Sequence, residues 1–70
     1  MKFTKTGPEY IATTDIGTYI VHKSPFFTSQ WQANHKSPRQ NSPRVPAPHA
    51  FGTLREAKEW CIEDHEDRTN

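Results

Sequence analysis

Cys61 and His65 are the two side chains of this sequence whose types and spacing suggest chemistry most directly. They stand four residues apart, so on a helix both could reach one zinc ion. A tetrahedral zinc site needs two further ligands, and the other histidines, His22, His35 and His49, stand at no zinc-finger spacing. The simpler interpretation makes Cys61 a small buried apolar residue and His65 a cation near a helix end. We therefore expect neither a metal ion nor another cofactor.

Nucleophilic catalysis would require a thiolate or an activated hydroxyl beside a base. Cys61 lies on the inner face of an expected helix, and no Cys–His or Ser–His–Asp pattern is evident. The three glycines are scattered at positions 7, 17 and 52, so no glycine-rich loop is present to hold a phosphate. The carboxylates gather on one outer helix face and form no evident buried pair for acid–base work. The sequence therefore predicts a protein that is not an enzyme.

A basic segment offers the first candidate for binding. Ser-Pro-Arg occurs twice, at residues 37–39 and 42–44. Such turns resemble those of tails that lie along the minor groove of DNA, where arginine meets a narrow and negative groove. Lys36, Arg39 and Arg44 would then contact phosphates in a weak and salt-sensitive manner. The same segment could equally wrap a protein partner and become ordered on contact, or be a plain linker.

Acidic side chains at a regular spacing offer the second candidate. Glu56, Glu59 and Glu63 would line one face of a helix and present their carboxylates together. A rigid acidic helix can occupy a basic groove that normally holds nucleic acid. The simpler interpretation is a solvated helix face. Phe26, an aromatic residue outside the expected strands, is the third candidate contact.

The charge is distributed unevenly along the chain. Residues 1–54 carry six basic and two acidic side chains, whereas residues 55–70 carry three basic and six acidic ones, for a net charge of +1. This asymmetry predicts two surfaces of opposite potential, which steer partners without specifying the fold.

Length and composition limit what can position these residues. The chain has 70 residues and only 31% hydrophobic side chains, so any core is thin and a large enclosed active site is excluded. No stretch is apolar enough to span a membrane, and the first residues contain no apolar secretion signal. The single cysteine, Cys61, fits a reducing compartment, so we expect a cytoplasmic protein.

Two runs of β-branched and aromatic residues, at 10–13 and 18–22, flank a short turn and predict a hairpin. Pro25 should close the second of these strands because proline cannot donate to a central ladder. A period of two from Phe27 to Asn34 predicts a third strand, with Trp31 and Phe27 directed toward the core.

Beyond this sheet, at residues 10–34, four of the six prolines fall within residues 35–52, which we expect to be an extended basic loop. Thr53 with Glu56 forms a capping box and begins a helix expected over residues 53–66, followed by a frayed tail at 67–70. Residues 1–70 would thus form a single small domain.

The fold class follows from these elements: an α+β domain with a three-stranded antiparallel sheet packed by one C-terminal helix. The candidate core residues are Tyr10, Tyr19, Val21, Trp31, Leu54, Ala57, Trp60 and Cys61. The sheet face away from the helix would remain open, and some of Ile11, Ile20, His22 and Phe26 would make it a binding surface.

The pattern Phe51-x-Thr53-x-x-Glu56-Ala57-x-x-Trp60 after three strands resembles the arm-type DNA-binding domain of phage tyrosine integrases. It is also similar to the small phage and prophage accessory proteins of β-β-β-α layout. The layout covers residues 10–65, and the motif covers residues 51–60. The resemblance implies a small binding protein of phage type.

The leading hypothesis is a non-enzymatic interaction protein, of phage or mobile-element type, that binds and modulates or inhibits a host protein or nucleoprotein complex, such as a defence or transcription machine. The alternative is a small DNA-binding regulatory protein that contacts DNA through its sheet and the Ser-Pro-Arg segment. The thin core also allows a homodimer that pairs strand edges or open sheet faces.

Overall fold

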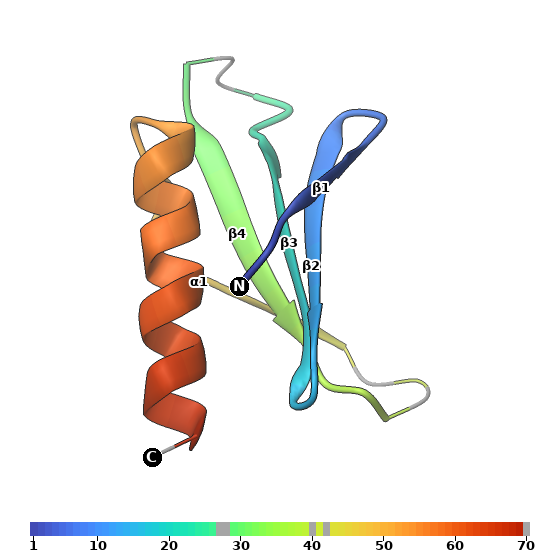
Figure 1. Cartoon of the computed structure of the whole chain (residues 1–70). Coiled ribbons are helices and arrows are strands. Elements are labelled where there is room, and N and C mark those ends of the chain that lie inside the picture. Colours follow the sequence, from blue (N-terminus) through green and yellow to red (C-terminus); the bar gives the residue numbers. More distant parts are fainter. Residues whose placement is uncertain (27–28, 40, 42, 70) are drawn as a thin grey trace.

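The computed structural model describes residues 1–26, 29–39, 41 and 43–69 (Figure 1). Five strands form one antiparallel sheet, and one helix follows them. The elements are β1 (Thr4–Thr6), β2 (Glu9–Thr14), β3 (Gly17–Lys23), β4 (Trp31–Lys36), β5 (Arg44–Pro46) and α1 (Leu54–Thr69). The expected α+β class, with an antiparallel sheet and one C-terminal helix, is confirmed.

The strands follow one another in the order β1-β2-β3-β4-β5, so each pairs with its neighbours in sequence. The first turn consists of Gly7 and Pro8, and Gly7 has a φ of +61°. A glycine with positive φ at the first position of a two-residue loop suits the twist of a hairpin. This turn places Lys5 opposite Tyr10 on the neighbouring strand.

The second hairpin is the one expected from the sequence. Thr14 pairs with Gly17, so the loop consists of Asp15 and Ile16. The Thr14 hydroxyl donates to the Gly17 carbonyl at 2.8 Å, and the Ile16 N–H donates to that hydroxyl at 3.3 Å. These two bonds satisfy polar groups of the tight turn, which therefore fixes the register of β2 and β3.

The prediction of three strands was wrong in number, and the third expected strand was placed too early. Ser29 and Gln30 lie outside the strand, which begins at Trp31 and runs to Lys36. Trp31 packs against the core as expected, whereas the expected core position of Phe27 lies outside the described residues. The added strand β1 has three exposed polar residues, a pattern without the apolar alternation that indicates a half-buried strand.

The proline-rich segment contains more structure than a loop over residues 35–52. β4 continues through Lys36, and β5 pairs with it at the edge of the sheet. Pro46 is tolerated there because an edge strand has a side that needs no ladder donor. Phe51 then forms a bridge with Trp31 through two backbone hydrogen bonds, of 2.7 and 2.8 Å.

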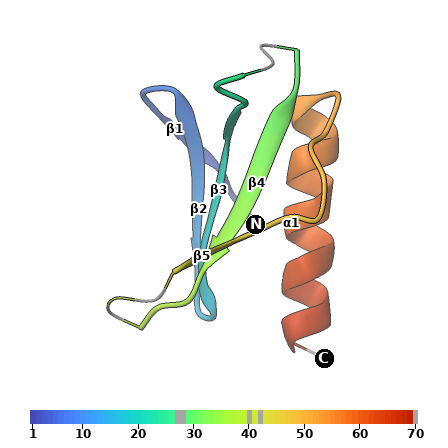
Figure 2. The same ribbon diagram turned by 180° about the vertical axis from the view of Figure 1, so that it is seen from behind.

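β5 runs steeply across the sheet on the face that the helix leaves uncovered (Figure 2). An ion pair of 3.7 Å between Arg44 of β5 and Glu9 of β2 agrees with this crossing. Ile20 points to the same face and is only 5% exposed. The expectation that Ile20 could be an exposed contact residue of this sheet face was therefore wrong. Ile11 and His22, which lie on the same face, are half-buried.

The helix begins as the capping box predicts, because the Glu56 N–H donates to the Thr53 hydroxyl at 3.1 Å. It ends later than expected, at Thr69 instead of residue 66. Arg68 bonds to Asp64 at 2.6 Å across one turn, and this pair supports residues for which we expected a frayed tail. No helix among the described residues has the length and apolar character to cross a membrane.

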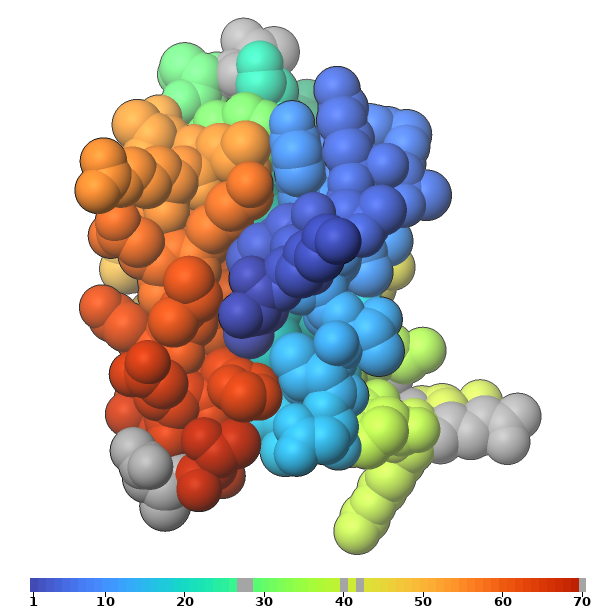
Figure 3. All heavy atoms as spheres, viewed as in Figure 1, coloured from blue at the N-terminus to red at the C-terminus, as the bar shows by residue number. Residues whose placement is uncertain are grey.

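The core lies between the helix and one face of the sheet. The eight candidate core residues named above lie in it or pack against it, and Ala12, Ala33 and Phe51 join them as buried members. The helix packs on β4 and β3, where the small side chain of Ala33 lets it approach closely, and Ala57 and Cys61 are fully buried. The N-terminal segment lies across the boundary between helix and sheet (Figure 3), where Lys58 of α1 stands 5.4 Å from the ring centre of Phe3.

Candidate functional site

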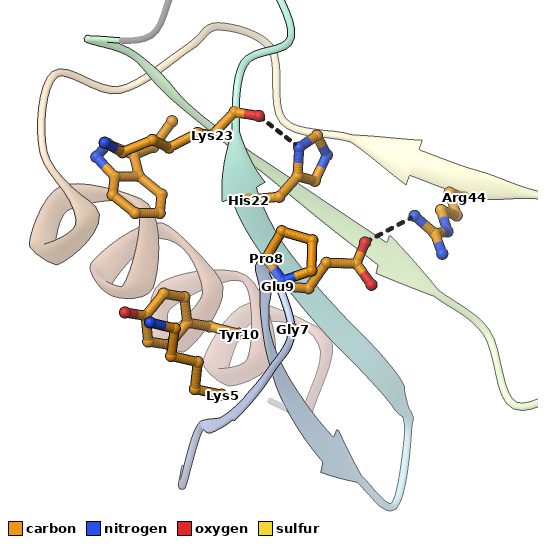
Figure 4. A pocket seen from close by; sticks show the side chains of 9 residues that line it. Lys5, Gly7, Pro8, Glu9, Tyr10, His22, Lys23 and Arg44 are labelled. Atoms are coloured by element: carbon orange, nitrogen blue, oxygen red, sulfur yellow. Dashed lines mark hydrogen bonds and ion pairs between the residues drawn. The ribbon is translucent and has the colours of Figure 1, made fainter.

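A cleft of about 550 Å³ opens at the end of the sheet where the β1–β2 turn, the end of β3 and the start of β4 meet (Figure 4). This volume lies within the range of small-ligand sites. Its lining residues are Lys5, Gly7, Pro8, Glu9, Tyr10, His22, Lys23, Trp31 and Arg44. Only basic, aromatic and small residues and a single carboxylate therefore line the cleft.

Strand pairing places a lysine beside each of the two aromatic rings of the cleft. Lys5 stands opposite Tyr10 in the β1–β2 pair, and Lys23 stands opposite Trp31 in the β3–β4 pair. The Lys5 and Lys23 ammonium groups lie 5.9 and 5.5 Å from the respective ring centres. The rings meet edge to face, with centres 6.0 Å apart, and both are half-buried. Cation–π attraction holds the ammonium groups over the rings.

The helix adds a third cation to this group. The Lys58 ammonium lies 5.0 Å from the ring centre of Tyr10. In the described part of the chain, no ion pair joins Lys5, Lys23 or Lys58 to a carboxylate. Glu9, the single carboxylate of the lining, is paired with Arg44. The described lining of the cleft thus holds three basic side chains, Lys5, Lys23 and Arg44, against one carboxylate, which gives the cleft a positive potential.

The three expected basic residues lie together at one hairpin. Lys36 ends β4 and stands opposite Arg44, which begins β5. Arg39 is exposed in the connection between them. Because Arg44 also lines the cleft, the basic surface continues from the cleft to this hairpin.

The other expected contacts lie elsewhere on the molecule. Phe26 is 84% exposed in the connection after β3 and does not line the cleft. Glu56, Glu59 and Glu63 are exposed on α1, on the side opposite the buried Ala57 and Cys61. Glu59 pairs with Arg55 at 3.1 Å, so its charge is partly balanced. The structure thus separates the acidic candidates from the basic ones.

A second polar cluster joins the far end of the helix to the sheet. The Tyr19 hydroxyl donates to Asp64 Oδ2 at 2.6 Å, and Arg68 Nε donates to the same oxygen. Burial acts to raise the pKa of Asp64, but the hydrogen bonds from Tyr19 and Arg68 outweigh it and hold that pKa below its usual range. Burial, with the bond to Asp64, raises the pKa of Tyr19. This cluster fastens the helix to the sheet.

We expect Asp64→Asn to change how stability depends on pH. The folded-state pKa of Asp64 lies below its unfolded value, so the carboxylate stabilises the fold above the unfolded pKa, and this contribution is lost as pH falls through the folded pKa. The urea midpoint of the native chain should therefore fall between about pH 5 and pH 2, and the urea midpoint of the variant should fall less. The exposed Asp67→Asn serves as the control, and an equal fall in all three chains would contradict the prediction.

The environment of Cys61 and His65 opposes metal binding through this pair. Burial, with the nearby carboxylate of Asp64, raises the pKa of the Cys61 thiol to about 12, which disfavours the thiolate that binds metals or attacks substrates. His65 Nε2 instead lies 3.6 Å from Asp15 Oδ1 in the β2–β3 turn. Among the described residues, no group of three or more histidine, cysteine or acidic side chains could hold a metal ion.

Sequence reasoning missed the cleft, its two lysines and the approach of Lys58 to Tyr10. One signal was present, because a two-residue turn at Gly7 and Pro8 places Lys5 opposite Tyr10 once the hairpin is assumed. Lys23 and Trp31 come together across a longer connection that carries no such signal. Lys58 reaches Tyr10 only through the packing of the helix on the sheet.

No protein-family model, no curated protein and no solved structure matches this chain. The resemblance to integrase arm-type domains and phage accessory proteins therefore stays a prediction.

Proposed function

We propose that this chain is a small non-enzymatic interaction protein that binds a nucleoprotein complex and modulates its activity. The observation that carries this proposal is the cleft, where Lys5 and Lys23 lie beside two aromatic rings and Lys58 of α1 lies near one of these rings. Cations beside aromatic rings favour an anionic partner that also has flat apolar groups. Nucleic acid within a nucleoprotein complex has both properties.

The distribution of charge on the surface supports a partner that contains both nucleic acid and protein. The outer face of α1 presents Glu56, Glu63, Glu66 and Asp67 to solvent. Such a surface is complementary to the basic protein surfaces that hold nucleic acid. A chain with a basic cleft and an acidic helix face can contact the nucleic acid and the protein of one complex.

The environment of the reactive groups favours binding over catalysis. The Cys61 thiol is buried and resists deprotonation, and the outer carboxylates of the helix are exposed to water. A buried thiol and solvated surface carboxylates favour a binding role over nucleophilic or acid–base catalysis. We further propose a phage or mobile-element setting, with a host defence or transcription machine as the target, and this part rests on the sequence resemblance alone.

Pull-down from a bacterial lysate, with and without nuclease, tests the proposed function. We expect a discrete protein partner that remains after nuclease treatment and is lost when Glu56→Gln and Glu63→Gln are combined. Thr4→Lys with Thr13→Lys is the matched control, because it makes the same change in net charge at exposed sheet positions. Equal recovery with both double variants, or no recovery with the native chain, would contradict the proposal.

A further inference from the structure

We propose that the cleft binds a single-stranded segment of nucleic acid, with one base against Tyr10 and Trp31 and the adjoining phosphates on Lys5 and Lys23. This inference rests on the proposed function and names the ligand class of its cleft. The two ring centres are 6.0 Å apart, and each ring has a lysine directly opposite on the paired strand. Proteins that hold single strands combine these two features, a stacking platform and a basic groove.

The ammonium groups over the rings are suited to exchange partners when a strand binds. Lys5 and Lys23 are exposed and end long flexible side chains. A base that approaches the rings brings its phosphates within reach of those ammonium groups. Exposed cation–π contacts are weak, so phosphate contacts can replace them at small cost.

The basic surface continues in the direction that a longer strand would follow. Arg44 lines the cleft and stands opposite Lys36 in the β4–β5 pair, with Arg39 in the connection beyond. These three residues are the basic side chains in and next to the Ser-Pro-Arg segment, so that segment would contact phosphates of the same strand of nucleic acid. Lys58 of α1 adds positive charge close to the Tyr10 ring.

Charge and size favour a single strand over a duplex. The outer face of α1 carries exposed carboxylates, so the helix is unsuited to enter a major groove lined by phosphates. A cleft of about 550 Å³ accommodates one nucleotide, that is, a base with its sugar and phosphate. The bases of a duplex are stacked and paired within the double helix and are therefore not free to enter the cleft. The half-buried rings can be reached only by a base that has left its stack.

Fluorescence anisotropy of a labelled oligonucleotide, titrated with the purified full chain, tests this inference. The probes are oligothymidylate and oligouridylate of about 10 nucleotides, which distinguish DNA from RNA, and a duplex of equal length. We expect binding to at least one single strand with a dissociation constant on the order of 10 μM at low salt, and weaker binding to the duplex.

Variants locate the binding site. Lys5→Ala with Lys23→Ala should weaken binding about tenfold and reduce the salt slope by about 1.4, since each of the two phosphate contacts on a single strand contributes about 0.7. Tyr10→Leu should weaken binding about tenfold with little change in the slope. Lys2→Ala, outside the cleft lining, should bind like the native chain. Circular dichroism checks that each variant is folded. If Tyr10→Leu unfolds, the substitutions of the exposed Lys5 and Lys23 still test the inference, because they remove no core contact.

Several results would overturn the inference: no binding of either single strand at low salt, equal or tighter binding of the duplex, or an equal loss with Lys2→Ala. These outcomes are independent of the pull-down. A chain that binds no oligonucleotide but still captures a partner through Glu56 and Glu63 would overturn this inference and leave a protein-binding role for the helix face. Oligonucleotide binding without a captured complex would support the cleft as a nucleic-acid site and contradict the proposed function.

Discussion

Alanine in place of Gly17 is expected to lower the free energy of unfolding by about 3–5 kcal/mol, a large part of the stability of so small a domain. Gly17 begins β3 with a φ of +140°, which L side chains rarely adopt. A Cβ there would also meet the Lys36 carbonyl oxygen and would lie 2.6 Å from His35 Nε2. Backbone strain and overlap with the neighbouring strand therefore act together.

The other two glycines separate these two causes. Gly7 has a φ of +61° but nothing within 4 Å of an added Cβ, so Gly7→Ala should cost about 1–2 kcal/mol from strain alone. Gly52 has open space and no positive φ, so Gly52→Ala should change stability by less than about 0.5 kcal/mol. Urea unfolding followed by circular dichroism gives all three values. If Gly17→Ala is as stable as Gly7→Ala, β4 can shift away from the added Cβ, and the predicted cost of steric overlap is wrong.

Phe51→Ala should cost about 3–5 kcal/mol, because it removes a buried aromatic ring from the core. Phe51 is 6% exposed, and its ring centre lies 6.4 Å from that of Trp60 and 4.7 Å from that of His49. It is also the point at which the segment after β5 returns to the sheet beside Trp31. We therefore expect the loss of this ring to loosen the segment as well as the core.

Phe26→Ala is the matched control, since the same side chain is removed from a site that is 84% exposed. Phe26→Ala should change the free energy of unfolding, measured by thermal unfolding, by less than about 0.5 kcal/mol. Hydrogen exchange of the amides of Val45 and Ala47 follows the segment directly, and these amides should exchange faster in Phe51→Ala. If both phenylalanine variants unfold at the same temperature as the native chain, the role assigned to Phe51 is wrong.

The elements that the sequence predicted well are those specified by local signals. The β2–β3 hairpin has alternating apolar residues around a turn that ends in Gly17, and the helix has Thr53 as its N-cap. Each signal lies within a few residues of the structure that it specifies. The contrast between Phe26 and Phe51 shows the limit, because exposure of a phenylalanine in an irregular segment depends on distant neighbours.

The parts that the sequence did not predict depend on pairing between distant residues. β1 and β5 have three exposed residues each, and they become strands because β2 and β4 offer free edges. The cleft has the same origin, since Lys23 meets Trp31 only after β3 and β4 are in register. The basic segment was found as a motif, but its continuity with the cleft depends on the place of Arg44 in the sheet.

The buried thiol gives this protein a reporter of its own local opening. Cys61 is the single cysteine and lies fully buried between α1 and the sheet, so a thiol reagent can reach it only when these two layers part. Under conditions where the layers close faster than the reagent reacts, the labelling rate measures the free energy of that opening. The reaction can be followed at native pH and without denaturant, and it reports the opening of one particular contact within the intact chain.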